Sequence, residues 1–181
     1  MVEERIVDIC APTLAGIKCG GLFTITDTSK DLTNEIANVN SQLVPHGIMV
    51  TTLKVRCGTL VYVYRDDLLQ RIEDTDRRSM ELLSGLGYCT SSTDGLVGSL
   101  RRKTEEQGCV PHEIGLFLGY PYDDVVGFMR YGGRNAKCSG CWKVYGSIEK
   151  AKMMFDVIWR CREAYRDMYR AGADICDLAV S

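Results

Sequence analysis

Apolar residues recur at helical spacing along several stretches of this chain. The longest stretch covers residues 147–170, and its apolar stripe consists of Ala151, Met154, Phe155, Ile158, Cys161, Tyr165 and Met168. A shorter stripe over residues 32–43 follows Ser29 and Asp31, either of which can cap a helix. Apolar positions three and four residues apart indicate amphipathic helices that turn one face toward a core. We therefore expect a helix in each stretch.

Val, Thr and Tyr are concentrated in two neighbouring segments, residues 48–56 and 59–65, as is typical of strands. Cys57 and Gly58 alone separate the two segments, and a two-residue connection favours a β-hairpin. We expect a further short extended segment over residues 22–26, after a pair of glycines. These signals predict a small sheet.

Proline, glycine and capping residues divide the rest of the chain into shorter elements. The expected helices are one or two over residues 1–18 broken around Pro12, several over 66–107, one over 111–119 with Pro111 in its first turn, and one over 122–131 begun by Asp123 or Asp124. Because strands and helices do not alternate regularly, the order predicts an α+β fold with a mostly antiparallel sheet. We expect one compact domain over residues 1–170 and a loose tail over residues 171–181.

Composition and charge limit the classes of partner. The chain has 181 residues, of which 45% are hydrophobic and 25% charged, as in ordinary globular domains. The net charge of −2 gives no bulk attraction to nucleic acid or to an anionic membrane. No apolar run approaches the roughly 20 residues that span a bilayer, and the charged first residues are not followed by a signal-peptide core. We expect a cytoplasmic protein without nucleic-acid or membrane partners.

Nine cysteines are many for a cytoplasmic chain. Reducing conditions argue against disulfides there, and an odd number leaves at least one thiol unpaired. Most of these thiols are predicted to be small buried apolar side chains, among them Cys57, Cys161 and Cys176.

Reactive side chains gather with Pro or Gly in three segments, residues 10–18, 111–121 and 138–146. In the first segment, Pro12 suits the first position of a helix, which would place Cys10 just before the helix N-terminus. Free backbone N–H groups and the helix dipole favour an anion there and would lower the pKa of the thiol. Lys18 could add positive charge. The alternative is a buried structural cysteine beside a proline turn.

The second segment places His112 and Glu113 in the first turn after Pro111. His112 could be a metal ligand or a general base, and Glu113 could orient it or bind a cation. A structural role for both is the alternative. The pattern is not a zincin signature, because no second histidine lies one turn further on and the other histidine, His46, lies in a predicted turn.

The third segment contains the pair Cys138 and Cys141, spaced as CxxC. Such a pair can be half of a zinc site, a redox couple or part of an iron–sulfur site. Because the chain has no second CxxC, a metal centre would have to recruit Cys10, Cys109 or His112 through the fold. The candidate ligands of iron or zinc are therefore Cys10, His112, Cys138 and Cys141.

Residues 142–145 are predicted to form a strand. Alternation along a strand places Trp142 and Val144 on one side and Lys143 and Tyr145 on the other. We expect Trp142 to pack in the core. If the second side borders a site, Lys143 and Tyr145 could hold an anionic or aromatic ligand.

The three segments together resemble the DUF3793 family, a group of bacterial proteins of unknown function. The resemblance covers most of the chain and is densest over residues 10–23, 111–128 and 138–146. The family pattern has a tyrosine where this chain has Cys141, and Cys19 and Cys109 also depart from the pattern. The matching polar residues are Cys10, His112, Glu113 and Cys138. Family members often lie near flavodoxin and ferrous-iron transport genes, which implies iron or redox physiology.

Three hypotheses follow. The first is a protein that binds a metal, an iron-containing cofactor or a redox partner such as a flavodoxin through Cys10, His112 and Cys138. The second is an enzyme acting on a small molecule with Cys10 as nucleophile, His112 as base and Glu113 as orienting group. The third is a non-catalytic adaptor or binding module in which the three segments define turns and core.

Overall fold

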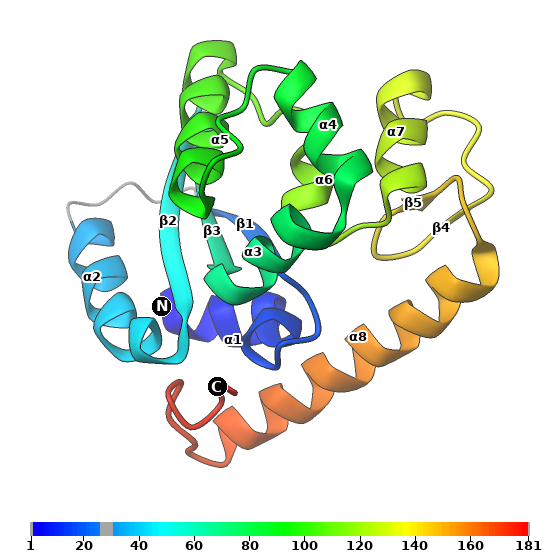
Figure 1. Cartoon of the computed structure of the whole chain (residues 1–181). Coiled ribbons are helices and arrows are strands. Elements are labelled where there is room, and N and C mark those ends of the chain that lie inside the picture. Colours follow the sequence, from blue (N-terminus) through cyan, green and yellow to red (C-terminus); the bar gives the residue numbers. More distant parts are fainter. Residues whose placement is uncertain (1, 26–30, 181) are drawn as a thin grey trace.

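The computed structural model describes residues 2–25 and 31–180. The elements, in chain order, are α1 (Val2–Leu14), β1 (Gly20–Ile25), α2 (Leu32–Leu43), a 3-10 turn η1 (Val44–His46), β2 (Ile48–Val55), β3 (Gly58–Arg65), α3 (Asp66–Thr75), α4 (Arg77–Gly85), α5 (Thr93–Gln107), α6 (Ile114–Phe117), α7 (Tyr122–Tyr131), β4 (Cys138–Ser139), β5 (Lys143–Val144) and α8 (Ile148–Arg170) (Figure 1). The predicted α+β fold is confirmed. The expected cap Ser29 and the expected strand residue Thr26 lie outside the described residues.

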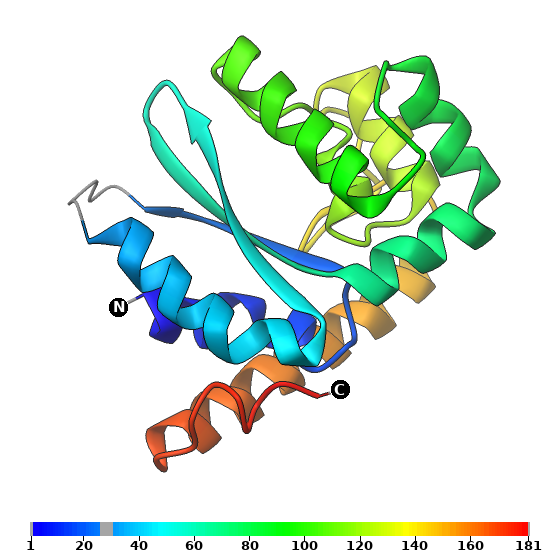
Figure 2. The ribbon, with the colours of Figure 1, turned by 60° about the vertical axis from the view of Figure 1, so that its left-hand side comes forward.

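The main sheet has three antiparallel strands in the order β1-β3-β2, so β3 is the central strand. The predicted hairpin is confirmed, with its two-residue connection at Arg56 and Cys57, one residue earlier than expected: β2 and β3 pair from Ile48↔Arg65 to Val55↔Gly58. Along β3, side chains alternate between two faces, and both faces are buried because helices cover each side of the sheet (Figure 2). Val61 and Val63 belong to one core, and Tyr62 and Tyr64 belong to the other.

The two cores divide the helices between the faces of the sheet. The first core joins Val61 and Val63 to α1, α2 and the segment after α8. The second core joins Tyr62 and Tyr64 to helices α3 to α7. A smaller apolar cluster lies beside the second core, where Trp142 and Val144 pack on Phe155 of α8. None of the described helices is both long and apolar enough to cross a membrane.

Helix α1 runs through Pro12, so the predicted break at this residue is wrong. A proline lacks the N–H that would bond to the carbonyl four residues earlier, which here is that of Asp8. The Nε–H of Arg162 on α8 donates to this carbonyl at 2.8 Å instead. Arg166 adds a salt bridge to the Asp8 carboxylate. Helix α8 thus supplies the bond that Pro12 removes, and α1 continues to Leu14.

The segment after α8 is packed, so the expected loose tail over residues 171–181 is wrong for the part that is described. Ile175 and Leu178 are buried in the first core. The N–H of Val180 donates to the Leu14 carbonyl at 3.1 Å. The buried Arg65 donates through Nη1 to the carbonyls of Leu14 at 3.3 Å and Val180 at 2.7 Å. These bonds fix the segment against the end of α1.

Helix α8 extends along the outer edge of the molecule (Figure 1). Its predicted buried stripe is confirmed at Ala151, Phe155, Ile158 and Cys161. Met154 and Met168, predicted in the same stripe, are instead 39% and 43% exposed. The helix is covered along one narrow face, and these two methionines lie beside that face.

Candidate functional site

The three sequence segments converge on a stack of aromatic rings. The ammonium of Lys18, from the first segment, lies 5.0 Å from the centre of the Tyr120 ring in the second. The Tyr120 ring stacks on that of Trp142, from the third segment, with centroids 4.7 Å apart and an interplanar angle of 26°. Trp142 in turn meets Phe155 edge to face at 4.6 Å. Segments that are far apart in the sequence therefore build one wall.

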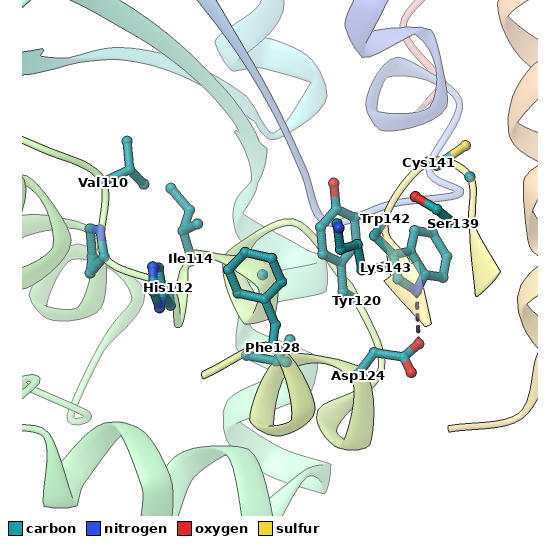
Figure 3. A pocket seen from close by; sticks show the side chains of 14 residues that line it. Val110, His112, Ile114, Tyr120, Asp124, Phe128, Ser139, Cys141, Trp142 and Lys143 are labelled. Atoms are coloured by element: carbon teal, nitrogen blue, oxygen red, sulfur yellow. Dashed lines mark hydrogen bonds between the residues drawn. The ribbon is translucent and has the colours of Figure 1, made fainter. Parts of the chain in front are cut away.

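Asp124 holds this wall in place. Its side chain is buried in the first turn of α7, and its Oδ2 accepts a bond from Trp142 Nε1 at 2.7 Å (Figure 3). Its Oδ1 accepts from the backbone N–H groups of Tyr145 and Gly146, both at 2.7 Å. Hydrogen bonds to a buried charged acceptor are strong, so the carboxylate fixes both the indole ring and the end of β5.

A hollow of about 390 Å³ lies against this wall, between α6 and α7 on one side and the β4–β5 hairpin on the other. The apolar side chains that line it are those of Val110, Pro111, Ile114, Tyr120, Val125, Phe128 and Trp142. The polar side chains that line it are those of His112, Asp124, Ser139, Cys141 and Lys143 (Figure 3). Its size is within the range of small-molecule sites.

Glycine is required in the hairpin that forms one side of the hollow. Gly140 lies so close to the Phe155 ring that an added Cβ would overlap it. On α7, Gly127 lies equally close to the Tyr145 side chain. Side chains at these positions would push the hairpin away from α7 and α8, so the glycines set the width of the hollow.

The polar groups that face the hollow are mainly hydrogen-bond donors. The exposed Lys143 ammonium donates to the Gly133 carbonyl at 2.8 Å, which leaves two of its N–H groups. The exposed His112 ring meets Phe128 edge to face at 5.0 Å. The Asp124 carboxylate is already occupied by its three donors. Residues 130–152 contain six Lys or Arg residues and one acidic residue, whereas the lining of the hollow itself has one lysine, Lys143, and one carboxylate, Asp124.

Cys10 lies inside α1 and not before its N-terminus, because the helix continues through Pro12. It is fully buried in the first core, where its Sγ packs against Gly21. Burial raises the pKa of the Cys10 thiol to about 12, and the nearby charges of Lys18 and Arg162 oppose this only in part. The predicted lowering of the pKa is therefore wrong in direction.

His112 and Glu113 are adjacent in sequence but have different surroundings. His112 lines the hollow, whereas Glu113 is buried and accepts a bond from the Tyr88 hydroxyl at 2.9 Å. Burial, together with the charge of Glu113, raises the pKa of Tyr88 well above its usual range. Cys10 belongs to the first core, on the other face of the sheet from Tyr88 and the residues around it. The geometry does not bring Cys10, His112 and Glu113 together.

The expected metal ligands are not assembled by the fold. Within residues 2–25 and 31–180, no group of three or more His, Cys, Asp or Glu side chains is placed to hold a metal ion. Cys138 and Cys141 are half-buried free thiols in the β4–β5 hairpin, packed beside the Trp142 cluster. Burial raises the pKa of the Cys141 thiol, with Lys18 and Arg162 opposing. The set of Cys10, His112, Cys138 and Cys141 is therefore not a metal centre in this structure.

The two lysines and the tyrosine expected to bind a cofactor have three different surroundings. Lys143 lines the hollow. Lys18 lies behind the Tyr120 ring, where burial lowers the pKa of its ammonium while the thiols of Cys10, Cys19 and Cys141 oppose. Tyr145 donates through its hydroxyl to the Arg134 carbonyl at 2.9 Å and stacks on Tyr131, so it braces the loop before β4.

Sequence reasoning did not single out Asp124, Tyr120 or Phe128 as site residues. Asp124 was expected only to begin a helix, and no local pattern shows that its carboxylate reaches an indole 18 residues away. The available signal was position alone, because all three residues belong to the segments that carry the family resemblance.

The comparisons with known proteins identify a family. The chain matches, over residues 6–179, a family described as "Protein of unknown function (DUF3793)". The match covers nearly the whole chain, so the chain belongs to this family, as the resemblance predicted. Searches among curated proteins and among solved structures found no match.

Proposed function

We propose that this protein is a binding module for a small aromatic anion, which it takes up in the hollow between α6–α7 and the β4–β5 hairpin. One observation carries the proposal: a hollow of about 390 Å³ has aromatic and apolar walls, offers donors from His112 and Lys143, and has its Asp124 carboxylate already bonded. Small-molecule sites typically combine such an apolar lining with a few placed polar groups.

The aromatic wall supports a planar ligand. The Trp142 ring is fixed by three contacts. Its Nε1 bonds to Asp124, its face stacks on Tyr120, and it meets Phe155 edge to face. Phe128 and Ile114 contribute further apolar surface to the same hollow. Rings that are fixed before binding lose little conformational freedom when a ligand stacks on them.

The charge around the hollow supports a negative ligand. The Lys143 ammonium in the lining of the hollow is exposed and keeps N–H groups free for a ligand, whereas the Asp124 carboxylate is buried and bonded to three donors. A carboxylate or sulfonate beside Lys143 would gain Coulomb energy, and an ammonium there would lose it. The attraction should weaken with salt, because the Lys143 side chain is exposed.

Thiol catalysis has less support than binding. Cys10 is fully buried and burial raises its pKa to about 12, so its thiol is neutral near pH 7. Cys141 is the thiol that lines the hollow, and burial raises its pKa as well. A redox partner such as a flavodoxin stays a prediction.

Fluorescence of Trp142 can test the proposal. The chain has two tryptophans, so Trp159→Phe leaves Trp142 as the single reporter in the wall of the hollow. This variant is titrated with 1-anilino-8-naphthalenesulfonate and with N-phenyl-1-naphthylamine, which has the same rings without the sulfonate. We expect saturable quenching of Trp142 by both probes and tighter binding of the sulfonate.

A pair of lysine variants tests the contribution of charge. Lys143→Met should weaken binding of the sulfonate by roughly threefold to tenfold and leave the neutral probe unchanged. The matched control is Lys137→Met, because Lys137 is an exposed lysine directly before β4 that donates to the Gly146 carbonyl and does not line the hollow.

A third variant, Ser139→Phe, fills the hollow from its exposed edge and should block both probes. Binding that Ser139→Phe leaves intact would contradict the proposal, as would a sulfonate affinity no higher than that of the neutral probe.

A further inference from the structure

Helix α8 carries a second apolar seam besides the one that packs on the rest of the chain. Its members follow one another at alternating intervals of three and four residues: Met154, Val157, Cys161, Ala164 and Met168 on the helix, and Ala171, the residue that caps its C-terminal end. We propose that a second copy of this chain packs along this seam, with the two α8 helices antiparallel. This inference goes beyond the proposed function and does not depend on it.

The seam is apolar surface that the folded chain leaves open. Val157 is 46% exposed, Met154 39% and Met168 43%. Cys161 is buried and marks the boundary with the inner face of the helix. Because α8 lies along the outer edge of the molecule, a second helix can approach from outside (Figure 1). A row of exposed apolar side chains of this kind marks an interaction surface.

The spacing and the sizes of the seam residues fit a helix of the same sequence. An apolar repeat averaging 3.5 residues is the pattern along which two helices pack side by side. In an antiparallel alignment, Met154 of one copy lies opposite Ala171 of the other, Val157 opposite Met168, and Cys161 opposite Ala164. Every pair is apolar, and the small side chains at the centre and at the ends of the seam allow the helices to approach closely.

The charges beside the seam match in the same alignment. Arg160 and Asp167 lie seven residues apart on one flank of the seam. Within the described part of the chain, Arg160 has no ion pair, and Asp167 reaches only Arg170, at 3.9 Å. The antiparallel alignment brings Arg160 of each copy beside Asp167 of the other, which gives two symmetric ion pairs. A parallel alignment would leave these charges unmatched.

The length of the seam sets the expected strength of the dimer. The helical part of the seam, residues 154–170, extends about 26 Å. Two helices in contact over that length bury less surface than the roughly 1,200–2,000 Å² of a standard stable interface. We therefore expect a reversible dimer that dissociates on dilution.

Sedimentation velocity of the full-length protein over a range of concentrations tests the inference. The parent protein should change from monomer to dimer as concentration rises, and Val157→Glu should remain monomeric. The matched control is Trp159→Glu, which alters a residue 52% exposed on the same helix but outside the seam, and which should dimerise like the parent. A parent that stays monomeric at every concentration overturns the inference, and so does a dimer that survives Val157→Glu.

Charge exchange and cross-linking test the orientation. Arg160→Asp should weaken the dimer, and adding Asp167→Arg to the same chain should restore it.

Oxidation by diamide should cross-link a double variant that carries both Val157→Cys and Met168→Cys, because these positions face each other in the antiparallel dimer. The single variant Val157→Cys should not be cross-linked through position 157. Peptide mass spectrometry separates the new bridge from those of native cysteines. Cross-linking of the single variant through position 157 would overturn the antiparallel arrangement.

Discussion

The segment around Cys10 and the segments around the hollow have similar reactive residues but opposite surroundings. In the first, a cysteine near Pro12 is fully buried, and the carbonyl that the proline leaves free is bonded by Arg162. In the second, Pro111 and the β4–β5 hairpin leave His112 and Lys143 exposed on the wall of a hollow. The comparison shows that burial and hydrogen-bond partners decide whether a reactive side chain is available.

Each of the two regions also depends on one buried charged side chain, and the two have different tasks. Arg65 donates to the carbonyls of Leu14 and Val180 and so joins α1 to the last residues of the chain. Asp124 accepts from Trp142, Tyr145 and Gly146 and so shapes the wall of the hollow. Removing Arg65 should loosen the first region, and removing Asp124 should disturb the second.

The largest effect is expected from Asp124→Ala. This change leaves three donors without their acceptor, two of them backbone N–H groups, and should lower the free energy of unfolding by about 3 kcal/mol or more. Urea unfolding followed by circular dichroism measures the loss. The neighbouring Asp123→Ala is the control, because Asp123 pairs with Arg78 at the surface and should matter far less. Equal losses in both variants would contradict the role given to Asp124.

Arg65→Met should have the second largest effect. The free energy of unfolding should fall by about 2–3 kcal/mol, because two carbonyls lose a charged donor. Residues 171–180 should become accessible to a protease in the folded protein, while probe binding in the hollow stays as in the parent. If Arg65→Met abolished probe binding in the hollow while residues 171–180 stayed protected from the protease, the proposed separation of the two regions would be wrong.

The buried thiols should make the free energy of unfolding depend on pH. Burial raises the pKa values of Cys10 and Cys19 to about 12, whereas thiols in the unfolded chain titrate near a pKa of about 8.5. Their stabilising contribution is complete below about pH 8.5. It falls as pH rises, by up to about 1.4 kcal/mol per pH unit for each thiol, because the unfolded chain then loses protons that the folded chain keeps.

Urea midpoints measured under reducing conditions between about pH 7.5 and pH 10 report this slope. Cys10→Ala should make the slope shallower than in the parent protein. A slope that is the same in Cys10→Ala and in the parent would show that the Cys10 thiol titrates normally in the folded protein.

The smallest effect is expected at the hydrogen bond from Arg162 to the Asp8 carbonyl, which replaces the helical bond lost at Pro12. Arg162→Met should cost about 1 kcal/mol in the parent and less in a Pro12→Ala background, where the amide at position 12 can bond to the Asp8 carbonyl. A double-mutant cycle of unfolding free energies should therefore give a coupling of roughly 0.5–1 kcal/mol. Zero coupling would mean that Arg162 stabilises α1 through other contacts.

The elements with local signals could be predicted from the sequence. The hairpin follows from strand composition around Cys57 and Gly58, and α7 and α8 follow from periodicity and their glycine or serine boundaries. The continuation of α1 through Pro12 could not be predicted, because the compensating donor is Arg162, far along the chain. The packed end of the chain depends in the same way on Arg65.

Sequence reasoning named some of the residues that line the hollow but did not place the others correctly. The three segments do meet, and Lys143 and His112 do face a hollow, but the expected convergence of Cys10 with His112 does not occur. Spacing in sequence cannot show on which face of a sheet a helix packs, and that placement separates the two residues. For the same reason the role of Asp124 becomes visible only with its three donors in place.

The most direct test of the central claim is to follow the two indole N–H signals by nuclear magnetic resonance while 1-anilino-8-naphthalenesulfonate is added. Trp142 bonds to Asp124 beside the hollow, whereas Trp159 is exposed on α8 and serves as the internal control. The proposed function predicts that the Trp142 signal shifts to saturation while the Trp159 signal stays in place. A stationary Trp142 signal, or a shift confined to Trp159, would contradict it.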